Sequence, residues 1–356
     1  MACFWKNERN AVEVCLSEVG NYVYIGYEAP DPYDSLIEVA RDLSGYAKIA
    51  LPDGLPGNGA MYSKRRYVYS PHYDTVPNPN TVTISRHDGA GVFSEISGIP
   101  TGLAANAKEV IYAAGKLRAI NEDAGFVDSL YESDDGETWA MAPGSVSFPR
   151  ASGGYPAYYT VLGGRLISMR YGAATSSVYA LNYSDDGGAT WSAGTGSNVS
   201  GLGNTPYPFV HSGPNIIAVH GGNIFIGTSG AAWTLYAGLY NDVFTVPKGP
   251  RIAASGAGLV VAAGVEASSS DYAFAYSSNH GGSWATRTQV AGGLPDLSNV
   301  KALFYDPVSV EFVAFVKRGD TDDFQIYTSP TGQNWTAGIV IPQTSLNSVN
   351  VVQVID

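Results

Sequence analysis

The stretch Tyr183–Trp191 (YSDDGGATW) places two adjacent acids beside two glycines, a threonine and a tryptophan. Paired carboxylates can act as general acid and base, and acids beside glycine in a loop can bind Ca²⁺. The same residues also suit a tight turn, because Ser and Asp side chains accept hydrogen bonds from turn N–H groups and Gly adopts backbone angles closed to other residues. A catalytic site is usually unique and a turn can recur, so recurrence decides between these interpretations.

The pattern Ser-x-Asp-x-Gly-x-Thr-Trp recurs along the chain. The best copy contains Ser184, Asp186, Gly188, Thr190 and Trp191. Aligned on glycine and tryptophan, the other copies contain Asp134, Gly136 and Trp139; Ser277, Asn279, Gly281 and Trp284; and Thr328, Gly332 and Trp335. Repeated identical turns explain these acids without chemistry, so we interpret them as structural. The acidic run Asp320, Asp322 and Asp323 lacks the glycine and distal acid of an EF-hand loop, which makes a calcium site the weaker alternative.

The spacing of the copies predicts a repeat of about fifty residues. Trp191 lies 52 residues after Trp139, Trp284 a further 93 and Trp335 a further 51, so one copy is expected near Asn241, Asp242 and Phe244. Two earlier units are expected to end near Tyr46 and Phe93. Units of this length with four short strands each are typical of a β-propeller.

We therefore predict an all-β chain forming a seven-bladed β-propeller of four-stranded antiparallel blades, with six blades as the alternative. Residues 21–356 are expected to form a single domain, and residues 1–20 an N-terminal arm or strap. The C-terminal segment NSVNVVQVID is expected to pair with N-terminal strands and close the ring, because an open ring would leave long sheet edges exposed.

The recurring pattern resembles the Asp-box, or BNR repeat, of the sialidase-like superfamily. The resemblance implies a turn that joins the third and fourth strands of each blade. In such a blade the loops between second and third strands lie at the opposite end, together with the connections between blades. That opposite face is the expected ligand-binding face.

The expected ligand-binding face carries aromatic side chains among acids and arginines. Rings that stack on C–H faces beside polar groups that bind hydroxyls suit sugar recognition, although polar loops can also be simply solvated. The candidate residues are Tyr33, Asp34, His72, Tyr73, Asp74, Glu122, Asp123, Tyr155, Arg170, Tyr171, Tyr207, Glu266 and Arg318.

The composition excludes several partners and cofactors. Charged residues make up 15% of the chain, against roughly 25% in a soluble domain, and the net charge is −12. This charge disfavours nucleic acid and anionic membranes. No apolar run is long enough to cross a bilayer, and no secretory signal is recognised, so synthesis in a cytoplasm is expected. Two cysteines and five histidines show no zinc-type spacing, and we predict no metal and no cofactor.

The sequence favours a binding protein over an enzyme. A sialidase would need an arginine clamp and a Tyr–Glu pair, and no arginine here matches the family's pattern; hence no catalytic residue is assigned. Low charge, many Gly and Tyr and almost no Cys resemble bacteriophage virion proteins. We predict a non-enzymatic virion component, associated with the tail or a fibre, that contacts other virion proteins or cell-surface glycan. In one version of this prediction the chain forms a symmetric oligomer within the particle. The alternatives are a sialidase-like exo-glycosidase and a free-standing bacterial carbohydrate-binding propeller.

Overall fold

The computed structural model describes somewhat less than three fifths of the chain. These residues are 14–16, 22–26, 35–40, 46–50, 62–64, 67–74, 81–87, 93–95, 107–113, 116–122, 127–135, 138–142, 148–149, 158–171, 179–188, 190–196, 200–202, 209–220, 223–236, 244–266, 272–288, 299–306, 309–318 and 323–342. Among these residues no helix is long and apolar enough to cross a membrane.

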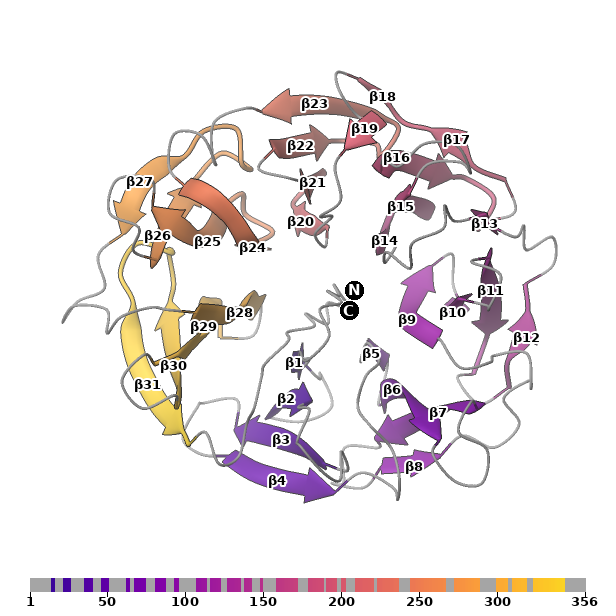
Figure 1. Ribbon diagram of the computed structural model, residues 1–356, viewed down its shortest axis with the longest axis horizontal. Coiled ribbons are helices and arrows are strands. Elements are labelled where there is room, and N and C mark those ends of the chain that lie inside the picture. Colours follow the sequence, from indigo (N-terminus) through magenta and orange to yellow (C-terminus); the bar gives the residue numbers. More distant parts are fainter. Residues whose placement is uncertain are drawn as a thin grey trace.

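The described strands form seven sheets that follow one another around a common axis (Figure 1). The first sheet contains β1 (Val14–Leu16), β2 (Tyr22–Gly26), β3 (Ser35–Ala40) and β4 (Tyr46–Ala50). The second contains β5 (Tyr62–Lys64), β6 (Tyr67–Asp74), β7 (Thr81–His87) and β8 (Phe93–Glu95). The third contains β9 (Ala107–Ala113), β10 (Lys116–Glu122), β11 (Val127–Ser133) and β12 (Ala140–Met141), with β13 (Phe148–Pro149) also paired to β11.

The remaining sheets repeat the same order. The fourth contains β14 (Tyr158–Leu162), β15 (Arg165–Tyr171), β16 (Tyr179–Ser184) and β17 (Ser192–Ala193), with β19 (Ser200–Leu202) paired to β16. The fifth contains β20 (Val210–Ser212), β21 (Asn215–His220), β22 (Asn223–Gly227), β23 (Ala232–Tyr236) and β18 (Thr195–Gly196). The sixth contains β24 (Phe244–Ala254), β25 (Val260–Glu266), β26 (Tyr272–Ser277) and β27 (Ala285–Thr288), and the seventh β28 (Asn299–Asp306), β29 (Glu311–Lys317), β30 (Phe324–Ser329) and β31 (Thr336–Ile341).

Consecutive strands of each sheet pair antiparallel, so each sheet is an up-and-down unit of four strands. The prediction of an all-β chain built from four-stranded antiparallel sheets is confirmed. The residues after 342 and before 14 lie outside the described residues. The ring-closing C-terminal strand and the N-terminal arm therefore stay predictions, although β1, within the first twenty residues, pairs with β2.

The described side chains of the second strands are buried on both faces in the fourth to seventh sheets. In β29, Phe312 to Val316 are all 3% exposed or less. The side chains of the outer strands alternate between buried and exposed, or are mostly exposed. In β31 only Ile341 is fully buried. A strand enclosed on both sides must be continuously apolar, which explains the unbroken apolar run in β29.

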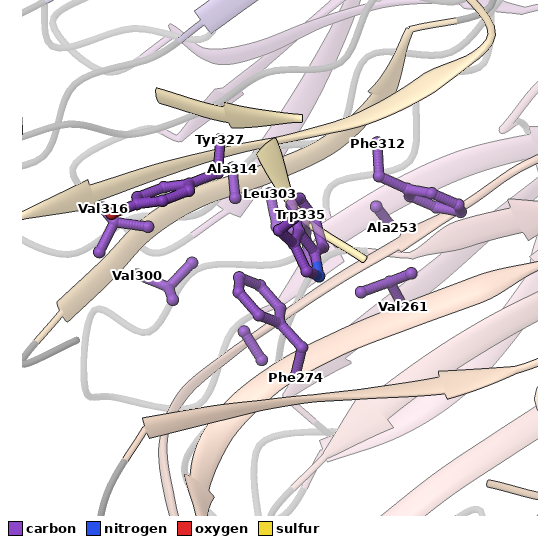
Figure 2. Packing of buried hydrophobic residues seen from close by; sticks show 11 residues of the cluster. Ala253, Val261, Phe274, Val300, Leu303, Phe312, Ala314, Val316, Tyr327 and Trp335 are labelled. Atoms are coloured by element: carbon purple, nitrogen blue, oxygen red, sulfur yellow. The ribbon is translucent and has the colours of Figure 1, made fainter. Parts of the chain in front are cut away.

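The clearest core lies between the sixth and seventh sheets (Figure 2). Ala253, Val261 and Phe274 come from the sixth sheet, and Phe312 and Trp335 belong to the seventh. The Phe274 and Trp335 rings stack with their centroids 4.3 Å apart. The tryptophan of the repeated pattern thus fills the space between two sheets.

One connection crosses from sheet to sheet at the outer rim. After β17 pairs with β16 in the fourth sheet, β18 pairs in parallel with β23 of the fifth. The Thr195 N–H donates to the Ala231 carbonyl at 2.7 Å. Gly196 lies so close to the Trp233 backbone that an added Cβ would overlap it, and its φ of 133° favours glycine. The outer edge of the fifth sheet is therefore covered by its neighbour's chain.

Candidate functional site

The turn between the third and fourth strands of the fourth sheet, residues 184–191, is held by a network of internal hydrogen bonds. We number each repeated turn by its sheet, so this one is the fourth turn. The Ser184 hydroxyl donates to Asp186 Oδ1 at 2.7 Å and accepts from the Gly188 N–H at 2.8 Å. Asp186 Oδ1 also accepts the Thr190 N–H at 2.8 Å, and its Oδ2 accepts the Thr190 hydroxyl at 2.5 Å. The Trp191 indole N–H donates to the Gly188 carbonyl at 3.0 Å. Both carboxylate oxygens are used to hold the turn.

The electrostatics of Asp186 argue against catalytic acid–base work. Hydrogen bonds from the Thr190 hydroxyl and N–H, and then from Ser184, lower the pKa of its carboxyl well below the usual value. A general base or acid works best with a pKa near the working pH. This carboxylate stays ionised and bound to its own turn, as expected of a structural residue.

We expect Asp186→Ala to destabilise the protein by about 1–2 kcal/mol, because three turn donors, the Ser184 hydroxyl and the Thr190 N–H and hydroxyl, lose their acceptor. Asp186→Asn is the matched variant, since Asn279 occupies the same place in the sixth turn and its Oδ1 accepts the Ser283 N–H at 2.8 Å. It should cost well under half as much. Urea denaturation of both variants checks this, and an equal loss in both would mean that charge, rather than the acceptor geometry, stabilises the turn.

The turns share a set of hydrogen bonds. In two of the turns, the residues that make these bonds differ from the residues aligned in the sequence. In the sixth turn Ser277 and Asn279 repeat the contacts of Ser184 and Asp186. In the third turn the contacts come from Ser133 and Asp135, so the acid lies one position after the aligned Asp134. Asp135 Oδ1 accepts the Ser133 hydroxyl at 3.1 Å and the Thr138 N–H at 2.7 Å.

The seventh turn shows the same shift. Ser329, rather than the aligned Thr328, accepts the Gly332 N–H at 2.8 Å. The cause is strand register: Ser329 lies opposite Phe312 as Ser184 lies opposite Leu166, so the third and seventh turns are one residue shorter than the fourth. Strand pairing within the sheet decides which hydroxyl faces the turn. Aligning the repeats on the tryptophan cannot detect this one-residue difference in turn length.

The fifth turn lies at Ser229–Trp233, and the prediction near Asn241, Asp242 and Phe244 is wrong. Phe244 begins β24 of the next sheet. The Trp233 indole N–H donates to the Gly230 carbonyl at 3.0 Å, as in the fourth, sixth and seventh turns. The acid is absent, and Ser229 Oγ accepts from the N–H groups of Ala231 and Ala232. The segment Gly227–Gly230 (GTSG) is thus the connection between the third and fourth strands of this sheet.

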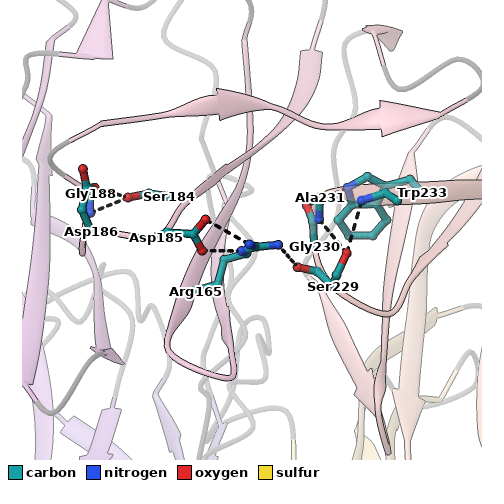
Figure 3. A network of polar contacts seen from close by, with 10 residues as sticks. Arg165, Ser184, Asp185, Asp186, Gly188, Ser229, Gly230, Ala231 and Trp233 are labelled. Carbon is teal, nitrogen blue, oxygen red and sulfur yellow. Dashed lines mark hydrogen bonds and ion pairs between the residues drawn. The ribbon is translucent and has the colours of Figure 1, made fainter.

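Arg165 joins two turns across neighbouring sheets (Figure 3). Its Nε lies 2.6 Å from Asp185 Oδ1 in its own sheet, and its Nη1 donates to the Ser229 carbonyl of the fifth turn at 2.7 Å. The guanidinium carbon also lies 4.5 Å from the centre of the Tyr183 ring. The hydrogen bond to Asp185 raises the pKa of Arg165. This second adjacent acid therefore orients an arginine that bridges sheets.

The candidate ligand-binding residues that the structure describes lie at the other end of the sheets. Because strands run up and down, connections between second and third strands are opposite the repeated turns. His72, Tyr73 and Asp74 end β6, and strand ends also carry Glu122, Arg170, Tyr171 and Glu266. Arg318 follows β29, and its N–H donates to the Asp323 carbonyl at 2.7 Å.

The other candidates, Tyr33, Asp34, Asp123, Tyr155 and Tyr207, lie outside the described residues. For the candidates within strands the backbone fixes a shared end of the ring, while their role in binding stays a prediction. Among the residues that the structure describes, no cluster of three His, Cys, Asp or Glu side chains could hold a metal ion.

Sequence comparisons give no relative: neither a family model nor a curated protein matches the chain. Solved structures do match. The BP39L lectin from Burkholderia pseudomallei aligns with 93% of this chain and 99% of its own, at a TM-score of 0.60 and 13% identity. A protein from Lactobacillus plantarum aligns with 90% and 95%, at 0.55 and 13%. A putative 6-phosphogluconolactonase from Bacteroides fragilis aligns with 99% and 100%, at 0.54 and 9%.

These similarities concern the fold. At 9–13% identity they carry no activity across, and the two neighbours with a named function, a lectin and a putative 6-phosphogluconolactonase, differ in that function. The near-complete coverage of both chains and the ring of four-stranded sheets support a β-propeller fold.

Proposed function

We propose that this protein is a non-enzymatic, carbohydrate-binding β-propeller whose ligand face lies opposite the repeated turns. The observation that carries the proposal is the match of nearly the whole chain to a lectin of the same architecture. The opposite end of the ring gathers strand ends with Tyr73, Tyr171, Asp74 and Arg170. Aromatic rings beside hydroxyl-binding polar groups suit sugars, and loops on a rigid scaffold are where such sites occur.

We further propose seven blades, one for each described sheet, closed by pairing of the two chain ends. The repeated turns would then be Asp-boxes: a serine hydroxyl and a carboxylate or amide hold the turn, and the following tryptophan donates to a glycine carbonyl. The contacts of Asp186, Asn279 and Asp135 support this assignment. In this proposal the boxes belong to the scaffold, and the other face would be available for ligand.

A glycan array followed by titration tests the proposal. Tyr73→Ala and Tyr171→Ala should each weaken binding of the best glycan by roughly tenfold, because tyrosine is enriched among the few contact residues whose truncation costs more than about 1 kcal/mol. Asn334→Ala is the control, since Asn334 is exposed in the seventh turn at the other end of the sheet, and it should bind like the parent protein. An array without any bound glycan, or tyrosine variants that bind as the parent does, would refute carbohydrate binding on this face.

Two further possibilities concern enzymatic activity and location. Turnover of fluorogenic glycosides would favour the sialidase-like alternative over a pure binder. The virion assignment rests on low charge, two cysteines and high Gly and Tyr content. Under it, the chain would be made in a host cytoplasm and contact other virion proteins. Mass spectrometry of purified particles checks it, because a protein found only free, outside particles, contradicts a structural role in the virion.

A further inference from the structure

In the fourth, fifth and sixth sheets, one position in the second strand contacts the turn of the following sheet. Ile167 in β15, Ile217 in β21 and Val261 in β25 occupy it, and all three are fully buried. Their side chains cover Gly230, Gly281 and Gly332 respectively, where an added Cβ would overlap or crowd them. We call the interface between two neighbouring sheets a seam. The seams between the fourth and fifth, fifth and sixth, and sixth and seventh sheets are therefore aliphatic at this position.

The third sheet has an arginine at this position. Arg118 pairs with Glu132, the residue before Ser133, as Ile167 pairs with Tyr183, the residue before Ser184. Its Nη1 donates to the Gly187 carbonyl of the fourth turn at 2.5 Å, and its Nη2 lies 3.5 Å from Glu132 Oε2. The side chains are only 8% and 14% exposed. A nearly buried ion pair thus stands where the next three seams have Ile or Val.

The fourth sheet contributes a second polar group to the same seam. Side chains alternate along a strand, so Ser168 faces the third sheet when its neighbour Ile167 faces the fifth. The register makes Ser168 equivalent to Ala218, Ala262 and Ala314, and all four are fully buried. Within the described ranges of the chain, Ser168 Oγ has no hydrogen-bond partner. The other three seams carry alanine there.

Polar groups change the free-energy cost of separating neighbouring sheets. Separation at an aliphatic seam exposes apolar surface to water and is opposed at about 25 cal/mol per Å². Separation at the seam between the third and fourth sheets hydrates Arg118, Glu132 and the Ser168 hydroxyl, which recovers much of their desolvation cost. The internal hydrogen bonds of the fourth turn involve no atom of the third sheet and would persist.

We propose that the ring opens at the seam between the third and fourth sheets, ahead of the three seams that follow it. The seam is polar on both sides, through Arg118 and Ser168. Opening here would separate the sheets while each keeps its own strand pairing. The proposal is independent of what the protein binds.

Thiol labelling at the four equivalent buried positions measures this opening. Ser168→Cys, Ala218→Cys, Ala262→Cys and Ala314→Cys, each in a background with Cys3→Ser and Cys15→Ser, place matched probes in four seams. A thiol reacts only when the seam exposes it, so labelling under native conditions reports local opening. Ser168→Cys should label at least about tenfold faster than the other three, with a rate that depends only weakly on urea, since little surface is exposed.

Arg118→Ile converts the polar seam to the type of its neighbours and should slow labelling of Ser168→Cys about tenfold, which is 1.4 kcal/mol. Glu132→Gln keeps the shape but leaves the buried arginine without its carboxylate, so labelling should become faster. If Arg118→Ile does not fold, the labelling rate of the Glu132→Gln variant still tests the proposal. Equal rates at the four probes, or rates at Ser168→Cys that neither variant changes, would overturn the proposal.

Discussion

Replacing Trp335 by alanine should lower the free energy of unfolding by about 3–5 kcal/mol, the range found for truncating a buried tryptophan. Trp335 is 1% exposed, stacks on Phe274 of the sixth sheet and donates its indole N–H to the Gly332 carbonyl at 3.2 Å. The variant loses apolar burial, opens a cavity between two sheets and leaves a buried carbonyl without its donor. A loss of this size can unfold a marginally stable domain.

Urea denaturation followed by far-ultraviolet circular dichroism measures the effect of Trp335→Ala. Gln333→Ala is the control, because Gln333 is exposed in the same turn and surface truncations usually change stability by about 0.5 kcal/mol or less. Trp335→Phe separates the two contributions, since it keeps most of the ring but not the N–H. A Trp335→Ala loss below about 1 kcal/mol would show that the indole does not tie the sixth and seventh sheets together.

Acid should destabilise the protein through His211. This residue of β20 lies against the fourth sheet, where its Nε2 is 2.6 Å from the Thr160 hydroxyl, and burial lowers its pKa to about 4. The unfolded chain binds a proton below about pH 6.5, whereas the folded chain does so only near pH 4. Stability is therefore unaffected above about pH 6.5 and falls by roughly 2–3 kcal/mol as the pH is lowered to about 4.

The comparison variant is His211→Gln, whose amide can still bond to Thr160 but does not titrate. Carboxylates also titrate in this range, so the quantity to measure is the difference in unfolding free energy between parent and variant at each pH. That difference should change in favour of the variant between about pH 6.5 and 4, and stay constant above. A difference independent of pH would mean that His211 is protonated in the folded state as readily as in the unfolded chain.

The repeated turns made the architecture predictable because each copy carries its own local chemistry. Gly188, Gly281 and Gly332 have positive φ, and the tryptophan three residues later returns its N–H to the glycine carbonyl. This Gly-x-x-Trp core also occurs at Gly230 and Trp233, and searching for it alone would have found the fifth turn. Demanding the acid directed the prediction to Asp242, beyond the end of the fifth sheet.

What could not be predicted depends on contacts between sheets. Arg118 and Glu132 look like an ordinary charged pair of an exposed strand, and only strand register shows that Arg118 occupies a seam position. The contact between Thr160 and His211 joins innermost strands 51 residues apart. The proposed ligand face would likewise be assembled from ends of different sheets, so the sequence could suggest an end of the sheets and residue types for it but not a geometry.

The parallel pairing of β18 with β23 has a mechanical consequence. The fourth sheet gives the fifth its outermost strand, so these two sheets cannot move apart without breaking main-chain hydrogen bonds. Arg165 and the Thr160–His211 contact tie the same pair together nearer the axis. The two sheets should therefore move together as one rigid unit. Any movement of neighbouring sheets relative to each other must then occur at the interfaces on either side of this unit.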